Sequence, residues 1–199
     1  MKKIIALITL IAVALSLCAC GASLSPTEKI EKYITKNGRE SKERLIVDFP
    51  EIASAVAEQE FTVAAMSGDY AKNQTCQLIK ENDKVYLEIV DEATLSNGMK
   101  MERIITIDLE GKYYFSNGIK YNSSFMGVKI NGEVPVETYT KGDQPVITSS
   151  ETSEGANVTD AVKKILKQYV DFSIDCLGEA VNSNGMKLTL SDIGFKAYK

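Results

Sequence analysis

The stretch MKMERIITIDL, residues 99–109, is the clearest strand signal in the chain and decides the fold. One of its faces carries Met99, Met101, Ile105, Ile107 and Leu109, and the other carries Lys100, Glu102, Thr106 and Asp108. Successive residues of a β-strand point to opposite faces, so this period of two predicts a strand with one buried face.

Asn-Gly pairs on both sides of this strand predict tight turns. Both residues accept the positive φ that a two-residue hairpin requires, which makes the pair a strong hairpin signal. The pairs stand at 97–98, 117–118, 131–132 and 184–185. The strands expected around them include 61–65, 76–78, 85–89, 113–115, 119–121, 134–139 and 186–190. Short strands joined in this way form an antiparallel meander.

Two helices are expected before the meander. Ser25, Pro26 and Glu28 form a capping box with proline at the first helical position, and the helix should end at Asn37-Gly38, where positive φ is tolerated. Residues 45–49 read either as a short strand or as the end of a helix. Pro50 then allows a helix over residues 51–60.

The most regular apolar stripe of the chain begins at Val158. It continues through Ala161, Val162, Ile165, Leu166 and Tyr169 at helical spacing. After Tyr169 the pattern fits two structures: residues 170–176 alternate as a strand would, whereas 176–181 would continue the helical stripe. The alternation narrowly favours a strand.

Residues 141–157 are polar, rich in Ser, Thr and Glu, and almost free of apolar side chains. Composition of this kind predicts a flexible acidic loop or linker. The fold class expected for residues 26–199 is therefore α+β, in one domain. A bent, half-barrel-like antiparallel meander should pack against two or three helices.

The first 19 residues have the layout of a secretory signal. Lys2 and Lys3 precede an apolar run over residues 4–17, and the small residue Ala19 precedes Cys20. The segment 17–20, LCAC, resembles the lipobox of bacterial lipoproteins, in which cleavage exposes a cysteine that receives a diacylglycerol. This resemblance implies lipidation at Cys20, a tether over residues 20–25, and a location on the outer face of the cytoplasmic membrane. The alternative is an uncleaved helix, since the run through Cys20 approaches the length of a membrane span.

The charge of the chain argues against two classes of partner. Without Lys2 and Lys3 the chain has 21 basic and 27 acidic residues, a net charge of −6. An acidic surface disfavours nucleic acid and anionic lipid headgroups, so the expected membrane attachment is through acyl chains.

Cys76 and Cys176 would remain in the exported domain. An oxidising compartment favours a disulfide between them, and the alternative is two separate buried thiols that behave as small apolar residues.

No catalytic or cofactor motif is present. The chain has no histidine and no tryptophan, which excludes serine–histidine and cysteine–histidine mechanisms and removes the commonest zinc ligand. No nucleophile elbow, phosphate loop or calcium loop occurs. We therefore expect a protein that is not an enzyme and takes no cofactor or metal.

Two apolar groups of residues could instead bind a ligand or a partner. Tyr113, Tyr114, Phe115 and Tyr121 cluster around one hairpin, where cross-strand packing and a sticky rim are alternative roles. The expected ligand face consists of Met99, Met101, Ile105 and Ile107.

A family resemblance supports the hypothesis that this apolar face binds a ligand. After the capped helix, the stretches EFTV (60–63), IKENDKVYL (79–87) and DLEGKYYF (108–115) resemble the LolA/LprG-like half-barrel lipoproteins of bacteria, over roughly residues 26–140. That resemblance implies a curved sheet that holds acyl chains against helices. The polar stretch 141–157 and the absence of a matching arginine latch depart from the family, so it transfers no binding residue.

Two functions are therefore expected from the sequence. The first is a surface lipoprotein that binds a lipid or other apolar ligand between sheet and helices. The second is an interaction or assembly lipoprotein, with a packed core and a protein partner.

Overall fold

The computed structural model describes residues 23–58, 70–153, 155 and 157–199. The signal segment with Cys20, and the strand expected at 61–65, lie outside the described residues. Every described core residue lies between Ile30 and Tyr198, so a chain that begins at residue 23 contains this whole core.

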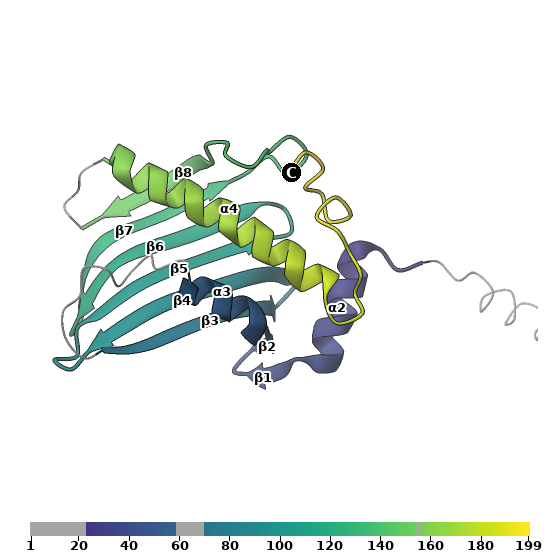
Figure 1. Cartoon of the computed structure of the whole chain (residues 1–199), viewed down its shortest axis with the longest axis horizontal. Coiled ribbons are helices and arrows are strands. Elements are labelled where there is room, and N and C mark those ends of the chain that lie inside the picture. Colours follow the sequence, from purple (N-terminus) through teal and green to yellow (C-terminus); the bar gives the residue numbers. More distant parts are fainter. Residues whose placement is uncertain (1–22, 59–69, 154, 156) are drawn as a thin grey trace, which may run out of the picture.

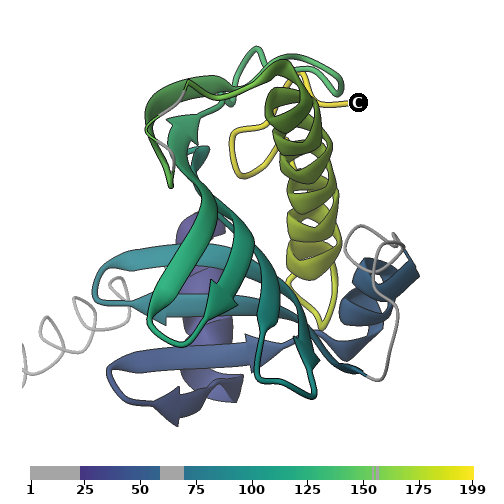
Figure 2. The same ribbon diagram turned by 90° about the vertical axis from the view of Figure 1, so that its left-hand side faces the viewer.

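The structure is an open antiparallel sheet of eight strands with helices on it, which confirms the predicted α+β class (Figure 1). Strand order follows the chain from β1 to β8, so the sheet is a simple meander. The sheet is strongly bent, and α4 crosses its concave side (Figure 2). The strands are β1 (Arg39–Ser41), β2 (Arg44–Asp48), β3 (Tyr70–Glu81), β4 (Lys84–Leu95), β5 (Lys100–Asp108), β6 (Lys112–Tyr121), β7 (Ser124–Glu133) and β8 (Val146–Thr152).

Strand β5 contains most of the stretch that predicted it and lies in the middle of the sheet. Ile105 pairs with Ile89 of β4 and with Phe115 of β6, and all three are buried. Ile107 stands two residues further on, between Leu87 and Tyr113. The period of two therefore places a row of large apolar side chains on the concave face.

The first helix, α2 (Pro26–Asn37), has the predicted capping box, in which the Ser25 side chain accepts from the Glu28 N–H and the Glu28 carboxylate accepts from the Ser25 N–H. It ends where predicted, but Gly38 has φ −72°, so the expected positive φ is wrong. Residues 45–49 belong mainly to strand β2, and α3 (Pro50–Glu58) follows at Pro50.

The last helix, α4 (Asp160–Asn182), is about twice as long as predicted, and the strand expected at 170–176 is wrong. Its buried residues recur at helical spacing far beyond Tyr169: Leu166, Tyr169, Val170, Ser173, Ile174, Cys176, Leu177, Ala180 and Val181. Ser173, which suggested a polar strand face, is buried and donates to the Val170 carbonyl one turn earlier (2.8 Å). At 1.5 Å per residue, the 23 residues of α4 span about 35 Å, enough to cross the sheet.

Two of the Asn-Gly turns predicted from the sequence are wrong, because both pairs lie inside strands. Asn117-Gly118 is in β6, where Gly118 faces Gly127 of β7. A Cβ on Gly118 would lie 2.5 Å from the Met126 carbonyl oxygen, so glycine serves close strand approach here. Asn131-Gly132 is in β7 at a register shift, where a Cβ on Gly132 would lie 2.2 Å from the Tyr113 hydroxyl. The hairpins turn instead at residues such as Asn82 and Asn122, which have positive φ.

Three further segments differ from the prediction. Residues 146–152 form the edge strand β8 within the stretch expected to be a flexible loop. The strand expected at 134–139 is wrong: Pro135 cannot donate to a ladder, and its carbonyl accepts from the Thr138 and Tyr139 N–H groups in a turn. Residues 186–190 form no strand either; the turn at Asn184-Gly185 leads from α4 into an irregular C-terminal segment.

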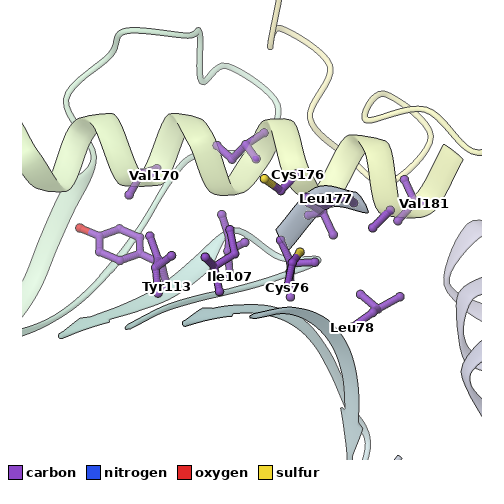
Figure 3. Close-up of a cluster of buried hydrophobic side chains, with 14 of the residues drawn as sticks. Cys76, Leu78, Ile107, Tyr113, Val170, Cys176, Leu177 and Val181 are labelled. Atoms are coloured by element: carbon purple, nitrogen blue, oxygen red, sulfur yellow. The ribbon is translucent and has the colours of Figure 1, made fainter. Parts of the chain in front are cut away.

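The core fills the space between α4 and the concave face of the sheet. Val170, Leu177 and Val181 point from α4 toward the sheet, and Leu78, Ile107 and Tyr113 point back (Figure 3). Within the described residues, no buried side-chain nitrogen or oxygen lacks a hydrogen-bond partner. None of the described helices is long and apolar enough to cross a bilayer.

Candidate functional site

The predicted ligand face divides into a covered part and an open part. Ile105 and Ile107 are 1% and 0% exposed beneath α4, where the Tyr169 ring packs against Phe115 with ring centres 5.6 Å apart. This part is filled by protein side chains. Met101 lies further along β5 and is half-buried, and Met99 is also half-buried just before the strand.

A row of polar side chains separates the two parts. Gln74, Asp91, Arg103 and Asn117 stand opposite one another on β3, β4, β5 and β6. The Gln74 amide donates to Asp91 (3.0 Å), and the Arg103 Nε donates to the Asn117 side-chain oxygen (2.6 Å). Asp91 is only 2% exposed. A carboxylate, a guanidinium and two amides are thus held side by side next to the apolar core.

Tyr169 of α4 covers this row. The Arg103 guanidinium carbon lies 5.5 Å from the Tyr169 ring centre, and Arg103 Nη1 donates to the Tyr169 hydroxyl at 3.3 Å. Burial raises the pKa of Tyr169 above its ordinary value, against the opposite influence of the nearby Arg103 charge. The phenol therefore stays neutral at physiological pH and can accept from the guanidinium.

Sequence reasoning missed Arg103. The only signal is its position: it falls on the apolar side of the 99–109 alternation, between Met101 and Ile105. Its partners come from distant parts of the chain, and only the folded sheet brings them together.

A pocket of about 350 Å³ opens beside this row, between the start of α4 and strands β6 to β8. Its apolar lining includes Met126, Val128, Val158 and Val162, and its polar lining includes Asn117, Thr152, Ser153 and Thr159. Asn117 belongs both to the pocket and to the polar row, so its amide is held in place by Arg103. Apolar walls with a few fixed polar groups are typical of small-molecule sites.

The predicted aromatic cluster is split between the two faces and the hairpin tip. Tyr113 and Phe115 are buried, and the Tyr113 hydroxyl donates to the Val146 carbonyl of β8 (2.8 Å). Tyr121 is 46% exposed near the β6–β7 turn, close in sequence to Met126, which is 63% exposed. Tyr113 and Phe115 therefore belong to the core, Tyr114 is half-buried, and Tyr121 presents apolar surface at the hairpin tip.

Cys76 of β3 and Cys176 of α4 face each other across the sheet–helix interface (Figure 3). Both are buried free thiols. The neighbouring Cys76 thiol, together with burial, raises the pKa of the Cys176 thiol above its ordinary value. The structure brings the two predicted partners together without a bond, so the disulfide stays a prediction.

No metal site emerges in the described part of the chain, where no three residues of the types His, Cys, Asp and Glu are grouped to hold an ion. The predicted lipidation site, Cys20, lies outside the described residues; the described chain begins close by, just before α2. Comparison of the chain with protein-family models, with curated proteins and with solved structures found no match.

Proposed function

We propose that this chain is an exported, non-enzymatic lipoprotein that binds a small apolar or amphipathic ligand at the start of α4. Acyl chains on Cys20 would hold it on the outer face of the cytoplasmic membrane. The pocket between α4 and strands β6 to β8 is the observation that carries the proposal. Membership of the LolA/LprG-like lipoproteins is part of the same proposal.

The size and lining of the pocket define the class of ligand. A volume of about 350 Å³ is at the low end of the range for small-molecule sites. Valine and methionine walls suit an acyl chain or a ring system, and the fixed Asn117 amide suits a polar group at one end. The ligand would therefore lie at the N-terminal end of α4, since protein side chains fill the region beneath the middle of that helix.

A substitution that fills the pocket tests the ligand proposal. Val162 lines the pocket and is half-buried, so Val162→Trp should occupy it. Native mass spectrometry of residues 23–199, with fatty acids and phospholipids added, should show an adduct for the wild type that Val162→Trp loses. Val146→Trp is the matched control, because Val146 is 48% exposed and does not line the pocket. An adduct that survives in Val162→Trp would place the ligand elsewhere.

The packed interior favours a second candidate, an interaction or assembly lipoprotein without a small ligand. Ile105 and Ile107 need no ligand to be buried, and Tyr121 and Met126 present apolar surface at the β6–β7 hairpin. If no lipid tried gives an adduct, the protein-partner function is the better explanation. Cross-linking from a photoreactive residue at position 121 would then identify the partner.

The anchor has its own test. Cys20→Ala should leave the precursor uncleaved and unacylated, as measured by mass spectrometry of the membrane fraction. Wild-type protein that is cleaved elsewhere, with Cys20 absent or bare, would contradict the lipobox interpretation.

A further inference from the structure

Four lysines gather at the end of the molecule where the described chain begins. Lys29, Lys32 and Lys36 lie on α2, and Lys187 follows the turn after α4. We call these four residues the basic patch. They line one open pocket of about 570 Å³ together with Leu24, Tyr33, Asn37, Asn184, Gly185 and Met186. The lining contains four positive charges and no carboxylate.

The fold of both segments produces this grouping. Ile30 and Ile34 are fully buried on the inner side of α2, so the lysines at 29, 32 and 36 occupy its exposed side. Asn184 and Gly185 have φ 53° and 83°, and this left-handed turn brings the chain back alongside α2. Lys187, exposed on that return, completes the patch.

Nearby carboxylates are engaged elsewhere. Glu31 pairs with Lys80 (3.2 Å), and Glu28 accepts from the Ser25 N–H and hydroxyl. Asp192 is close enough for Lys29 to contribute slightly to its lowered pKa, but its carboxylate accepts from Thr189. Within the described residues, none of the four lysines has a carboxylate within ion-pair distance.

The patch lies where the proposed anchor would place the membrane. Leu24, which lines the same pocket, is four residues after Cys20, a distance of at most about 14 Å in extended chain. In Figure 1 the described chain begins at this end, next to α2. We infer that the basic patch docks on the anionic phospholipid headgroups around the lipid anchor and so orients the domain. This inference rests on the proposed anchor at Cys20.

Such docking would position the ligand pocket as well. The helix α4 begins next to the pocket residue Thr159 and ends at Asn182, five residues before Lys187 of the basic patch. Its length of about 35 Å separates the two sites. With the patch on the bilayer, the pocket would open at the far end of the domain, toward partners in the extracytoplasmic space. The net charge of −6 is a sum over the chain and therefore does not reveal the local positive charge of the basic patch.

The test uses the processed protein, reconstituted into vesicles of phosphatidylcholine alone or mixed with phosphatidylglycerol. An amine reagent followed by mass spectrometry reports how accessible each lysine is. We expect labelling of all four patch lysines to fall on the anionic vesicles. Labelling of Lys84, Lys120 and Lys164, which are exposed and outside the patch, should stay unchanged. High salt should abolish the difference, because it shortens the Debye length to about 3 Å at 1 M.

Matched variants isolate the patch. Replacing Lys29, Lys32 and Lys36 by Gln should remove the protection of Lys187. Each lysine that is lost should weaken the docking equilibrium about fivefold. Replacing Lys84, Lys120 and Lys164 by Gln changes the net charge equally and should leave that protection intact. Loss of protection in both variants would show a general charge effect and overturn the inference.

Flotation separates failure of the patch from failure of the anchor. Protein that floats with neutral vesicles but is labelled equally on both kinds has an anchor and no docking, which overturns the inference. Failure of the protein to float with neutral vesicles would contradict the lipid anchor. Docking by the basic patch is then supported only if anionic vesicles still bind the protein and protect its patch lysines. Protection by inorganic phosphate without vesicles would show a free-anion site and overturn membrane docking.

Discussion

Arg103 on β5 and Tyr169 on α4 join the sheet to the helix through a guanidinium over an aromatic ring, 5.5 Å from its centre, with a hydrogen bond of 3.3 Å to the hydroxyl. Sixty-six residues of chain separate them. The contact lies where the packed core ends and the proposed pocket begins, and it holds the Asn117 amide at that boundary.

Arg103→Met should therefore lower the free energy of unfolding much more than removal of an ordinary surface charge does. Asp91 stands opposite Arg103 on β4 and is 2% exposed, so the variant leaves a buried carboxylate facing an apolar side chain. We expect a loss of about 3 kcal/mol in the free energy of unfolding, measured by urea denaturation.

The control is Arg39→Met. Arg39 pairs with Asp48 at 2.9 Å, but both side chains are about half exposed, at 53% and 49%. An exposed pair of this kind contributes at most about 1 kcal/mol. Equal losses in the two variants would show that the polar row is not a stabilising unit.

Gly118 gives a second prediction, because its lack of a side chain allows β6 and β7 to approach closely. Gly118→Ala would place a Cβ 2.5 Å from the Met126 carbonyl, and backbone cannot easily move aside. We expect a loss of about 2 kcal/mol in the free energy of unfolding. Gly98→Asn is the control: Gly98 has φ +82°, which Asn tolerates, and no heavy atom lies within 4 Å of a Cβ there. Its expected loss is about 1 kcal/mol, from the positive φ alone, and a loss equal to or larger than in Gly118→Ala would contradict the assignment.

The two glycine positions show why the meander was predictable and several turns were not. The alternation over residues 99–109 is a local property, and β5 follows it closely. Asn-Gly, by contrast, has two physical uses, a positive φ in a turn and close approach of neighbouring strands. Asn117-Gly118 has the second use, which depends on Gly127 in the partner strand and cannot be read locally.

The helix α4 and strand β8 were mispredicted for related reasons. Residues 170–176 satisfy both a period of two and a helical period, and only packing on the sheet selects the helix. Strand β8 is an edge strand whose side chains are mostly exposed, so its composition resembles that of a loop. The polar row of the candidate site draws on four strands, and no local pattern could have assembled it.

The C-terminal segment predicts a dependence of stability on alkaline pH. Tyr139 and Tyr198 stack with ring centres 6.1 Å apart, and each hydroxyl donates to an aspartate carboxylate on α4. Burial, aided by those carboxylates, raises the pKa of both phenols above the ordinary value of 10.0. A raised pKa means that the folded state keeps a proton that the unfolded chain loses. This stability is present below pH 10 and is lost as pH rises toward the folded pKa.

The free energy of unfolding should therefore fall above about pH 10, by at most about 1.4 kcal/mol per pH unit for each such phenol. Tyr139→Phe should flatten this fall while lowering stability at neutral pH, since it removes the hydrogen bond to Asp171. Tyr121→Phe, at an exposed position, should change neither. An alkaline fall that Tyr139→Phe leaves as steep as in the wild type would exclude Tyr139 as its source.

The last prediction concerns Cys76 and Cys176, whose buried thiols face each other between β3 and α4. In protein recovered from the exported compartment we expect them to be bridged, since a bond there closes a loop of about 100 residues and adds about 4.7 kcal/mol. Thiol titration of the denatured, unreduced protein should then find neither thiol.

The pH dependence of bridge formation provides a check on this contact. The raised pKa of Cys176 lowers the fraction of its thiolate at neutral pH, so oxidation that begins at Cys176 in the reduced, folded protein should be slow there. The rate of this route should rise with pH, because a larger fraction of Cys176 is then thiolate. Cys76→Ala supplies the control, because it should leave Cys176 as a single titratable thiol whatever the oxidant. Two free thiols in native exported protein, persisting after oxidation at high pH, would show that the contact is apolar packing alone.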